Sequence, residues 1–218
     1  MDFGRIFRSV VVIFCSAAAV AATSSGPHWD FNSDAAGALP QGWSARGGSP
    51  KGIYRIESEP NGNRYLAARS QGSDVQLGTE VTVNPQELPV LAWRWRVWEW
   101  PKNADERKLG TMDSAASVYV VFGSRLFPKV LKYVWSDTVP VGSVFRHPRS
   151  DRMAIVVVHS GERPAGQWQT VTRNILEDSR KIFGADAGAV IGIGVKTDSD
   201  STRTSARTDY DDLRFGTR

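Results

Sequence analysis

Cysteine is almost absent from this sequence. Of its 218 residues only Cys15 is a cysteine, and it lies in an apolar segment near the N-terminus. The rest of the chain therefore forms no disulfide and has no thiol chemistry. Its stability must come from a hydrophobic core, for which about 195 residues are enough. Histidine is scarce too, and His28, His147 and His159 lie too far apart for a local metal-binding motif.

Long apolar runs are also missing, except for one near the start. Val10–Val20 is apolar but too short to span a membrane comfortably. Arg5 and Arg8 precede it, and small residues at 19–22 offer a cleavage site. We therefore predict a secretory signal peptide over residues 1–22, a periplasmic or secreted protein, and no stable membrane insertion after cleavage. An uncleaved anchor is the alternative.

Neither sign of charge dominates the chain. It has 27 Lys and Arg against 23 Asp and Glu, a net charge of +4, which falls to +3 without residues 1–22. A mildly basic protein permits an anionic partner such as an acidic polysaccharide, but does not require one. Because the protein is predicted to be exported, we do not expect a nucleic-acid partner.

Familiar catalytic motifs are absent as well. The sequence has no Gly-x-Ser-x-Gly, His-Glu-x-x-His, Glu-x-Asp-x-Glu or Arg-x-Glu-x-Arg. Gly192 and Gly194 are not followed by the further glycine and helix of a nucleotide-binding loop. The sequence therefore names no reaction.

What the sequence does contain is a series of short apolar or alternating segments, separated by Gly, Pro, Asn and Asp. Ten such segments at this spacing favour an all-β, jelly-roll-like β-sandwich of two antiparallel sheets, forming a single domain over residues 23–218. The predicted strands are Gly52–Glu57, Tyr65–Arg69, Val75–Val83, Val90–Trp98, Ala115–Phe122, Val130–Trp135, Met153–Ser160, Gln167–Asn174, Val190–Thr197 and Tyr210–Phe215.

One segment is predicted to be a short helix instead. Asn174 is a good N-cap with Glu177 three residues later, and Gly184 suits the left-handed position after the last turn. Ile175–Phe183 carries a mostly apolar stripe between these signals.

The two ends of the chain are typical of sugar-binding jelly rolls. Trp29-Asp30-Phe31-Asn32 leads to the turn Leu39-Pro40-Gln41-Gly42-Trp43, and Tyr210-Asp211-Asp212-Leu213-Arg214-Phe215 closes the chain. We expect the first and last strands to pair.

Alternation with a period of two assigns the faces of the strands. In the strand 90–98, Leu91, Trp93, Trp95 and Val97 face the core, and Arg94, Arg96 and Trp98 share the other face with Ala92. Core positions elsewhere include Ala116, Val118, Val120 and Phe122, then Ile191, Ile193 and Val195, and the tryptophans Trp135 and Trp168.

Several phrases together resemble one bacterial exported family, the domain of unknown function numbered 3047, over about residues 29–215. They are Leu91–Val97, Lys108 with Asp113, Val118–Phe122, Tyr133–Trp135, Ser160-Gly161, Trp168, Arg173-Asn174, Phe183-Gly184, Thr197–Thr202 and Tyr210–Phe215. The resemblance implies no established activity. The family has two acids where this chain has Met112-Asp113, and Asn-Pro where it has His147-Pro148.

The leading candidate for ligand binding joins cations and aromatic rings. Guanidinium groups bind carboxylates with two hydrogen bonds, and rings stack on sugar faces. The alternative is a solvated, salt-bridged sheet face. The predicted ligand-binding residues are Arg94, Arg96, Trp98, Tyr119, Lys108 and Asp113.

Acidic residues at two places are candidate ligands for a structural calcium ion. Asp198 and Asp200 lie in an oxygen-rich loop of the kind that hard cations favour. Asp211 and Asp212 would meet Asp30 if the end strands pair, as jelly-roll resemblance implies. Ordinary solvated turns are the alternative for both.

These observations predict an exported binding module for a carbohydrate, or for another polar or anionic ligand of the cell envelope. Two alternatives stay open. One is a polysaccharide lyase or hydrolase with Tyr119, Lys108 and Asp113 near the chemistry, since a tyrosine beside a neutralised carboxylate can act as a base. The other is a structural or partner-binding envelope protein.

Overall fold

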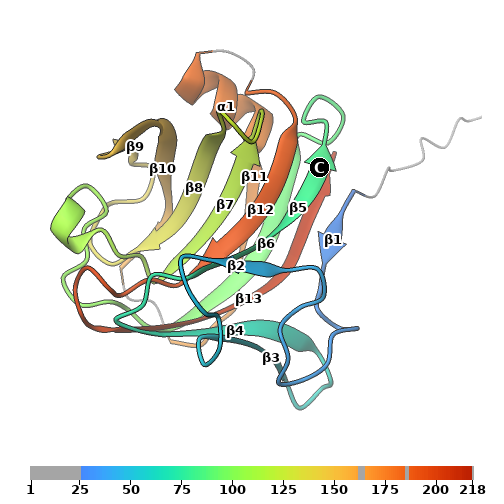
Figure 1. Cartoon of the computed structure of the whole chain (residues 1–218), viewed down its shortest axis with the longest axis vertical. Helices are drawn as coiled ribbons and strands as arrows, with labels where there is room; N and C mark the ends of the chain where they lie inside the picture. Colours follow the sequence, from blue (N-terminus) through green and yellow to red (C-terminus); the bar gives the residue numbers. More distant parts are fainter. Residues whose placement is uncertain (1–25, 162–164, 185–186, 218) are drawn as a thin grey trace, which may run out of the picture.

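The computed structural model describes residues 26–161, 165–184 and 187–217. Within them the chain forms a sandwich of two β-sheets with one α-helix at one end (Figure 1). Sheet A has the order β11-β6-β13-β4-β3, with β1 added on β13, and sheet B has the order β2-β5-β12-β7-β8-β10-β9. The strands of sheet A are β1 His28–Trp29, β3 Tyr54–Ser58, β4 Arg64–Gln71, β6 Val90–Glu99, β11 Gln169–Asn174 and β13 Ser205–Gly216. Those of sheet B are β2 Ser44–Arg46, β5 Gln76–Val83, β7 Ala116–Phe122, β8 Lys129–Ser136, β9 Val144–His147, β10 Ser150–Ser160 and β12 Val190–Lys196.

All ten predicted strands are present, with ends shifted by a few residues. The prediction missed β2 and β9, which have three and four residues and are too short for alternation to show. Pairing is antiparallel as expected, except that β10 pairs β8 in parallel. The loop between these two strands contains β9, which returns to pair the outer side of β10.

The predicted helix is confirmed as α1, Ile175–Phe183. The Asn174 side chain accepts a hydrogen bond from the Glu177 backbone N–H, which satisfies a free donor of the first turn. Gly184 has a φ of 73° and ends the helix in the left-handed conformation. A further turn of 3-10 helix, η1, spans Leu109–Thr111.

The first and last strands pair as predicted. His28 lies opposite Arg214 and Trp29 opposite Leu213, so β1 extends sheet A beside β13. The Trp29 ring packs edge-on against Trp43 and Phe215, which ties both ends of the chain to the same part of the core.

The core lies between the sheets and is rich in aromatic rings. Trp93 and Trp95 of β6 point inward and meet Tyr133 and Trp135 of β8, with ring centroids 5.4 and 6.0 Å apart. Burial of such large side chains is the main favourable contribution to folding, which a chain without disulfides requires.

Two assignments to the core were wrong. Trp168 lies on the outer face of sheet A, half-buried, because it stands in the loop before β11 rather than within the strand. Ile191 is half-buried and lines a surface cavity, because a bulge between Val190 and Gly192 breaks the alternation of β12.

No helix among the described residues is long and apolar enough to cross a membrane. The predicted signal peptide, residues 1–22, lies outside the described residues.

Candidate functional site

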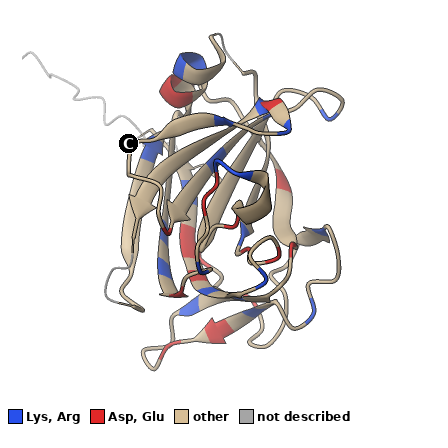
Figure 2. Cartoon of the chain, turned by 90° about the vertical axis from the view of Figure 1, so that its left-hand side faces the viewer, with Lys and Arg blue, Asp and Glu red and all other residues tan. Residues whose placement is uncertain are grey.

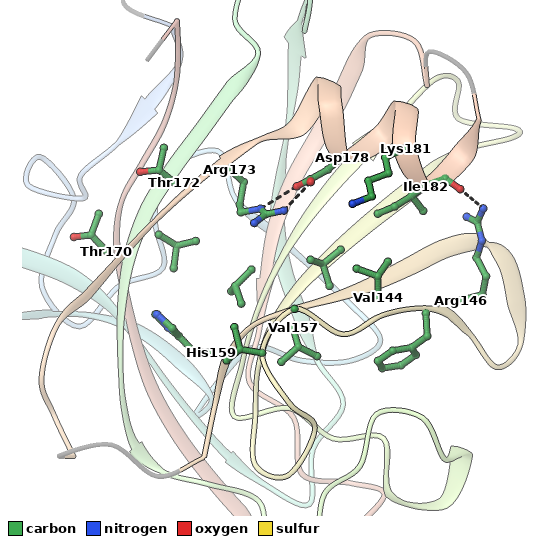
Figure 3. A pocket seen from close by; sticks show the side chains of 16 residues that line it. Val144, Arg146, Val157, His159, Thr170, Thr172, Arg173, Asp178, Lys181 and Ile182 are labelled. Carbon is green, nitrogen blue, oxygen red and sulfur yellow. Dashed lines mark hydrogen bonds and ion pairs between the residues drawn. The ribbon is translucent and has the colours of Figure 1, made fainter.

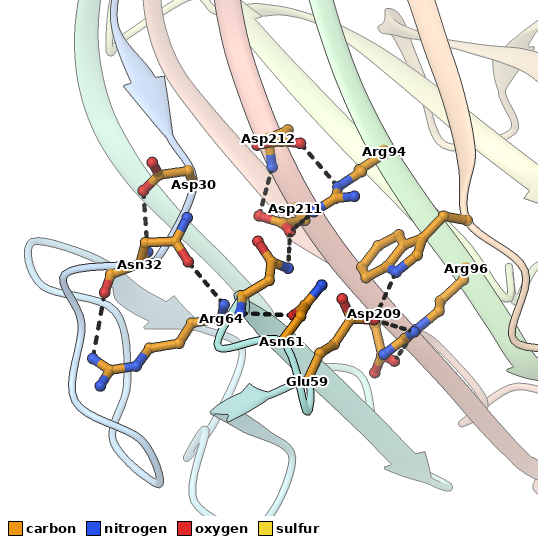
Figure 4. A network of polar contacts seen from close by, with 12 residues as sticks. Asp30, Asn32, Glu59, Asn61, Arg64, Arg94, Arg96, Asp209, Asp211 and Asp212 are labelled. Carbon is orange, nitrogen blue, oxygen red and sulfur yellow. Dashed lines mark hydrogen bonds and ion pairs between the residues drawn. The ribbon is translucent and has the colours of Figure 1, made fainter.

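The outer face of sheet A carries the predicted arginine cluster, and its cations are already paired (Figure 4). The Arg94 guanidinium forms ion pairs with Asp211 at 2.6 Å and Asp212 at 2.9 Å. The Arg96 guanidinium pairs with Asp209 at 2.7 Å and with Glu59 at 2.7 Å.

Aromatic groups complete this network. The Trp98 indole N–H donates to Asp209, and the Trp168 N–H donates to Glu59. The Arg96 guanidinium lies 4.4 Å from the centre of the Trp168 ring. Burial alone would raise the pKa of Glu59, but the bonds from Trp168 and Arg96 hold it below its ordinary value. The two arginines of this face are therefore paired with acids of the protein, as in the salt-bridge alternative, although Asp209 Oδ1 is buried without a hydrogen-bond partner among the described residues.

The other three predicted ligand residues are not on this face. Tyr119 lies on β7, in the opposite sheet, so the expectation that a strand next to β6 supplies it was wrong. Lys108 is exposed and pairs with Asp105 at 3.2 Å. Asp113 is buried and accepts hydrogen bonds from Ser201 and Thr202, so it orders the loop after β12.

A cavity of 370 Å³ lies over the outer face of sheet B, and Tyr119 lines it. We call it the sheet B groove. Figure 2 views this side of the molecule, where basic and acidic segments lie close together around η1. Residues of the groove that carry charge or titrate are Arg46, Asp74, Tyr119, Lys132, His147, Arg149, Lys196, Asp198 and Asp200.

Strand register explains how the groove forms. On the outer face of sheet B, Gly194 lies opposite Gly78 on one side and Tyr119 on the other, and Tyr119 lies opposite Lys132. Glycines leave the backbone bare at the middle of the sheet. A Cβ on Gly194 would come within 2.8 Å of the Gln76 side chain, so the glycine also permits this packing.

Lys196 is the central cation of the groove. Its ammonium forms ion pairs with Asp74 and, at 2.8 Å, with Asp198. Burial alone would lower the pKa of Lys196, but attraction to Tyr119 and Asp198 raises it above its ordinary value, so the ammonium stays charged. Burial raises the pKa of Asp198 to about 7, against the attraction of Lys196 and Lys132.

Other cations of the groove lack an anionic partner. The Lys132 side chain is buried, and its ammonium donates a hydrogen bond of 3.2 Å to the Ser114 hydroxyl. Arg46 and Arg149 are exposed and form no ion pair within the described part of the chain. Burial, with Lys132 and Arg149 nearby, lowers the pKa of His147 and favours its neutral form.

Two buried polar atoms near the groove are unsatisfied. Asp198 Oδ1 and the Ser117 hydroxyl have no hydrogen-bond partner among the described residues. Such groups are costly unless a further partner reaches them. The groove thus combines unpartnered cations with unpartnered acceptors.

The two predicted calcium sites fare differently. Carboxylate oxygens of Asp74, Asp198 and Asp200 lie within 4.8 Å of one another, so the structure brings Asp198 and Asp200 together, and Lys196 already supplies a cation there. Calcium at this place stays a prediction.

At the second predicted site, where Asp30 was expected to meet Asp211 and Asp212, each acid has another partner. The Asp30 carboxylate accepts from Asn32, whereas Asp211 and Asp212 bind Arg94. In the described residues these three acids form no group that could hold a metal.

A second cavity continues the groove along sheet B. Arg46 and Gln76 line both cavities, and the second one extends over Gly78 and Gly192 to Arg125. Arg125 pairs with Glu80 at 2.7 Å, and both side chains are largely exposed. The combined surface is a groove that is open along the sheet.

Sequence reasoning missed Arg46, Asp74, Lys132 and Lys196 as members of the site. One signal was available for Lys132, because a lysine between the apolar residues of the strand Lys129–Ser136 is unusual and indicates a polar site on the face opposite the core. No signal in the sequence indicated Asp74, which lies in a loop, or Arg46, which lies on a strand of three residues; both are distant in sequence from the rest of the site.

The fold and the groove define a two-sheet β-sandwich with a polar site on one outer face. A family model described as a protein of unknown function, DUF3047, matches residues 41–214, and the chain belongs to this family. A comparison with curated proteins finds no match.

Among solved structures, the chain is similar to the K1 cleaved adhesin domain of Lys-gingipain from Porphyromonas gingivalis, with 12% identity, 87% of this chain and 96% of that chain covered, and a TM-score of 0.39. It is similar to a family 30 carbohydrate-binding module of a cellulosomal cellulase from Clostridium thermocellum, with 10% identity, 88% and 92% covered, and a TM-score of 0.37. A cellulase derived from Cel12A of Rhodothermus marinus gives 12% identity, 78% and 94% covered, and 0.39. All three are distant likenesses.

Proposed function

We propose that this protein is an exported binding module for an acidic carbohydrate of the cell envelope, and that the sheet B groove holds the ligand. The single observation that carries the proposal is a set of cations in the groove that form no ion pair among the described residues: Arg46, Arg149 and Lys132. Cations placed together in a concave site favour a carboxylate or another anion.

Hydroxyl-rich ligands suit the rest of the groove. Asp198 lines the groove, and its Oδ1 has no hydrogen-bond partner among the described residues, so this oxygen has capacity for a further hydrogen bond. Asp200 offers a further acceptor for hydroxyl groups. The volume of 370 Å³ lies within the usual range for small-ligand sites, about 300–1,000 Å³.

A test of binding compares acidic and neutral glycans on an array, followed by calorimetry with the best acidic ligand. We expect uronate-containing glycans to bind, and the double variant Arg46→Ala/Arg149→Ala to weaken binding about tenfold or more, because each lost charge-assisted bond is worth about 1.5–3 kcal/mol. Arg214→Ala is the matched control, since Arg214 is an exposed arginine on β13, outside the groove.

Two results would contradict the proposal. One is an array on which no acidic glycan binds. The other is calorimetry in which the double variant binds as tightly as the parent. Binding should also weaken as salt rises, because attraction at an open site is screened over about 10 Å at 0.1 M ionic strength.

An enzyme remains the second candidate, on the strength of one observation. Burial raises the pKa of Asp198 to about 7, which would let this carboxyl both donate and accept a proton at neutral pH. Incubation with acidic polysaccharides, followed by an assay for new reducing ends or unsaturated uronates, tests this. Product that forms with the parent but not with Asp198→Asn would favour the enzyme.

Export itself is tested separately. Mass spectrometry of the protein from the native envelope should give an N-terminus near Ala22 or Thr23, as the predicted signal peptide requires. An intact Met1 in a cytoplasmic fraction would contradict export and leave the groove proposal to be judged on binding alone.

A further inference from the structure

A larger cavity lies between the edges of the two sheets, and its lining differs from that of the sheet B groove. It has a volume of 630 Å³ and lies between β11 at the edge of sheet A and β9 and β10 at the edge of sheet B (Figure 3). Helix α1 covers one end of it and contributes Asp178, Lys181 and Ile182.

The walls of this cavity combine a strip of apolar side chains with polar ones, which include Thr170 and Thr172 of β11. Side chains from both sheet edges and from α1 leave an aliphatic surface that no described element covers. Val141 and Val144 at its mouth are 56% and 50% exposed, which is unusual for branched apolar residues beside a cavity. The apolar lining consists chiefly of Val141, Val144, Phe145, Val158, Val171 and Ile182.

The charges beside these walls are predominantly positive. Arg173 and Asp178 neutralise each other through two hydrogen bonds of 2.9 and 2.7 Å. Lys181 is exposed and forms no ion pair among the described residues, and Arg146 donates to the Ile182 carbonyl rather than to an acid. Among the described residues Asp178 is the only acid that lines the cavity, so Lys181 and Arg146 give this described part of the rim an excess of positive charge.

An aromatic cluster stands at the opposite end. His159 lines the cavity, and its Nδ1 accepts a hydrogen bond of 3.0 Å from the Trp95 indole. The His159 ring lies 4.6 Å from the Trp135 ring. A ligand that enters the cavity would therefore change the surroundings of two tryptophans, which gives a spectroscopic signal independent of affinity.

We propose that this cavity binds one free fatty acid, with its chain between the sheet edges and its carboxylate at Lys181 and Arg146. The apolar strip suits the acyl chain of a single-chain carboxylate, and the cationic rim suits its carboxylate group. A cavity of this volume takes one ligand of small-molecule size, which fits one acyl chain rather than the two of a diacyl lipid. The proposal does not rest on glycan binding in the groove.

The experiment uses the protein without its predicted signal peptide, residues 23–218, and follows tryptophan fluorescence and calorimetry at concentrations below micelle formation. Decanoate and dodecanoate are the probes, with dodecanol as the uncharged counterpart. We expect dodecanoate to bind about fifteenfold more tightly than decanoate, because it has two more methylenes and each buried methylene adds about fourfold. Dodecanol should bind about three- to tenfold more weakly than dodecanoate.

Two pairs of variants locate the ligand. Lys181→Glu should weaken dodecanoate about three- to tenfold but leave dodecanol unchanged, and Lys102→Glu is its control, since Lys102 is an exposed lysine outside the cavity. Val144→Trp should fill the mouth and abolish binding of both probes. Leu126→Trp is its control, because Leu126 is exposed and does not line the cavity.

Several outcomes would overturn the proposal. They are no binding of dodecanoate, equal affinity for dodecanoate and dodecanol, and binding that Val144→Trp leaves intact. Thermal unfolding of each variant shows whether it is folded. If Val144→Trp is unfolded, Lys181→Glu still decides the question, because it should weaken the binding of dodecanoate and leave that of dodecanol unchanged.

Discussion

The two outer faces of this sandwich use the same kinds of residue to different effect. On sheet A, Arg94 lies opposite Asp211, and Arg96 opposite Asp209, so β13 supplies an acid for each arginine of β6. On sheet B, the position beside Tyr119 on β12 is Gly194, which has no side chain to offer. The register of the neighbouring strand therefore decides whether a cation receives an acidic partner from the adjacent strand, as Arg94 and Arg96 do, or meets a glycine there.

The two faces also differ in the partners of their buried charged groups. On sheet A both partners come from the protein, and the network holds β6, β13 and the loop before β11 together. In the sheet B groove Lys132 is buried beside a hydroxyl, and Asp198 keeps an unsatisfied oxygen. Each face keeps a buried carboxylate oxygen without a partner among the described residues, Asp209 Oδ1 on sheet A and Asp198 Oδ1 on sheet B, so the contrast between the faces lies in the pairing of their cations.

The largest effect is expected from breaking the closed face. Asp209→Ala removes the acceptor of both Arg96 and Trp98 from a buried position. It should cost about 2–4 kcal/mol of unfolding free energy, because Arg96 loses one of its two acidic partners and the Trp98 N–H loses its acceptor, and leave glycan binding unchanged. Urea unfolding measures the loss, with Asp212→Asn as the control at a half-exposed position. A loss below about 1 kcal/mol would mean that this network is not structural.

A second prediction concerns the pH dependence of the open face. The folded protein keeps the Asp198 proton up to about pH 7, whereas the unfolded chain releases it near its ordinary value of 3.8. The folded state therefore binds more protons between these values, and the stability contributed by Asp198 falls as pH rises through this window. The groups that face it are Lys196 and Lys132, which oppose the shift, and Asp113, which adds to it.

The measurement compares the parent with Asp198→Asn, whose side chain does not titrate. Relative to this variant, the parent should lose about 1.4 kcal/mol of unfolding free energy per pH unit between pH 4 and 7. Chemical denaturation at pH 5, 6 and 7 gives the difference. A gap that stays constant over this range would show that Asp198 is ionised throughout.

A third prediction separates stability from binding in the groove. Lys132→Met keeps the length of the side chain but removes its buried charge, so unfolding free energy should change by about 1 kcal/mol or less, or even rise. Affinity for the acidic glycan should fall about tenfold or more. If thermal unfolding reveals a loss of several kcal/mol instead, Lys132 is part of the folding network and the contrast between the faces fails.

Local patterns predicted most of the fold. Alternation located the inward tryptophans Trp93 and Trp95, and capping residues fixed both ends of α1. Alternation also placed Arg94 and Arg96 together correctly, but it could not say that β13 would bring Asp209 and Asp211 into register with them. Pairing between distant strands depends on the whole topology, which no local period contains.

The same limit applies to the site. Tyr119 was singled out, but its partners Lys132 and Lys196 come from β8 and β12, and their proximity follows from strand order rather than from spacing in the sequence. The Trp168 error has a related cause, because apolar character alone does not separate a core residue from one that covers an ion-paired face.

The smallest effect on stability is expected at the far end of the open face. Arg125 and Glu80 form an exposed ion pair, and such pairs contribute little, so Arg125→Ala should change the unfolding free energy by less than about 0.5 kcal/mol. Because Arg125 lines the second cavity, a short acidic ligand held at Arg46 and Lys132 should bind this variant normally, whereas a longer oligosaccharide that reaches along Gly78 and Gly192 should bind about three- to tenfold more weakly. Calorimetry with an oligosaccharide series measures both. If Arg125→Ala weakens binding equally for every oligosaccharide length, the arginine acts through its long-range electrostatic attraction and not by direct contact. If it weakens binding at no length, the binding site is confined to the first cavity.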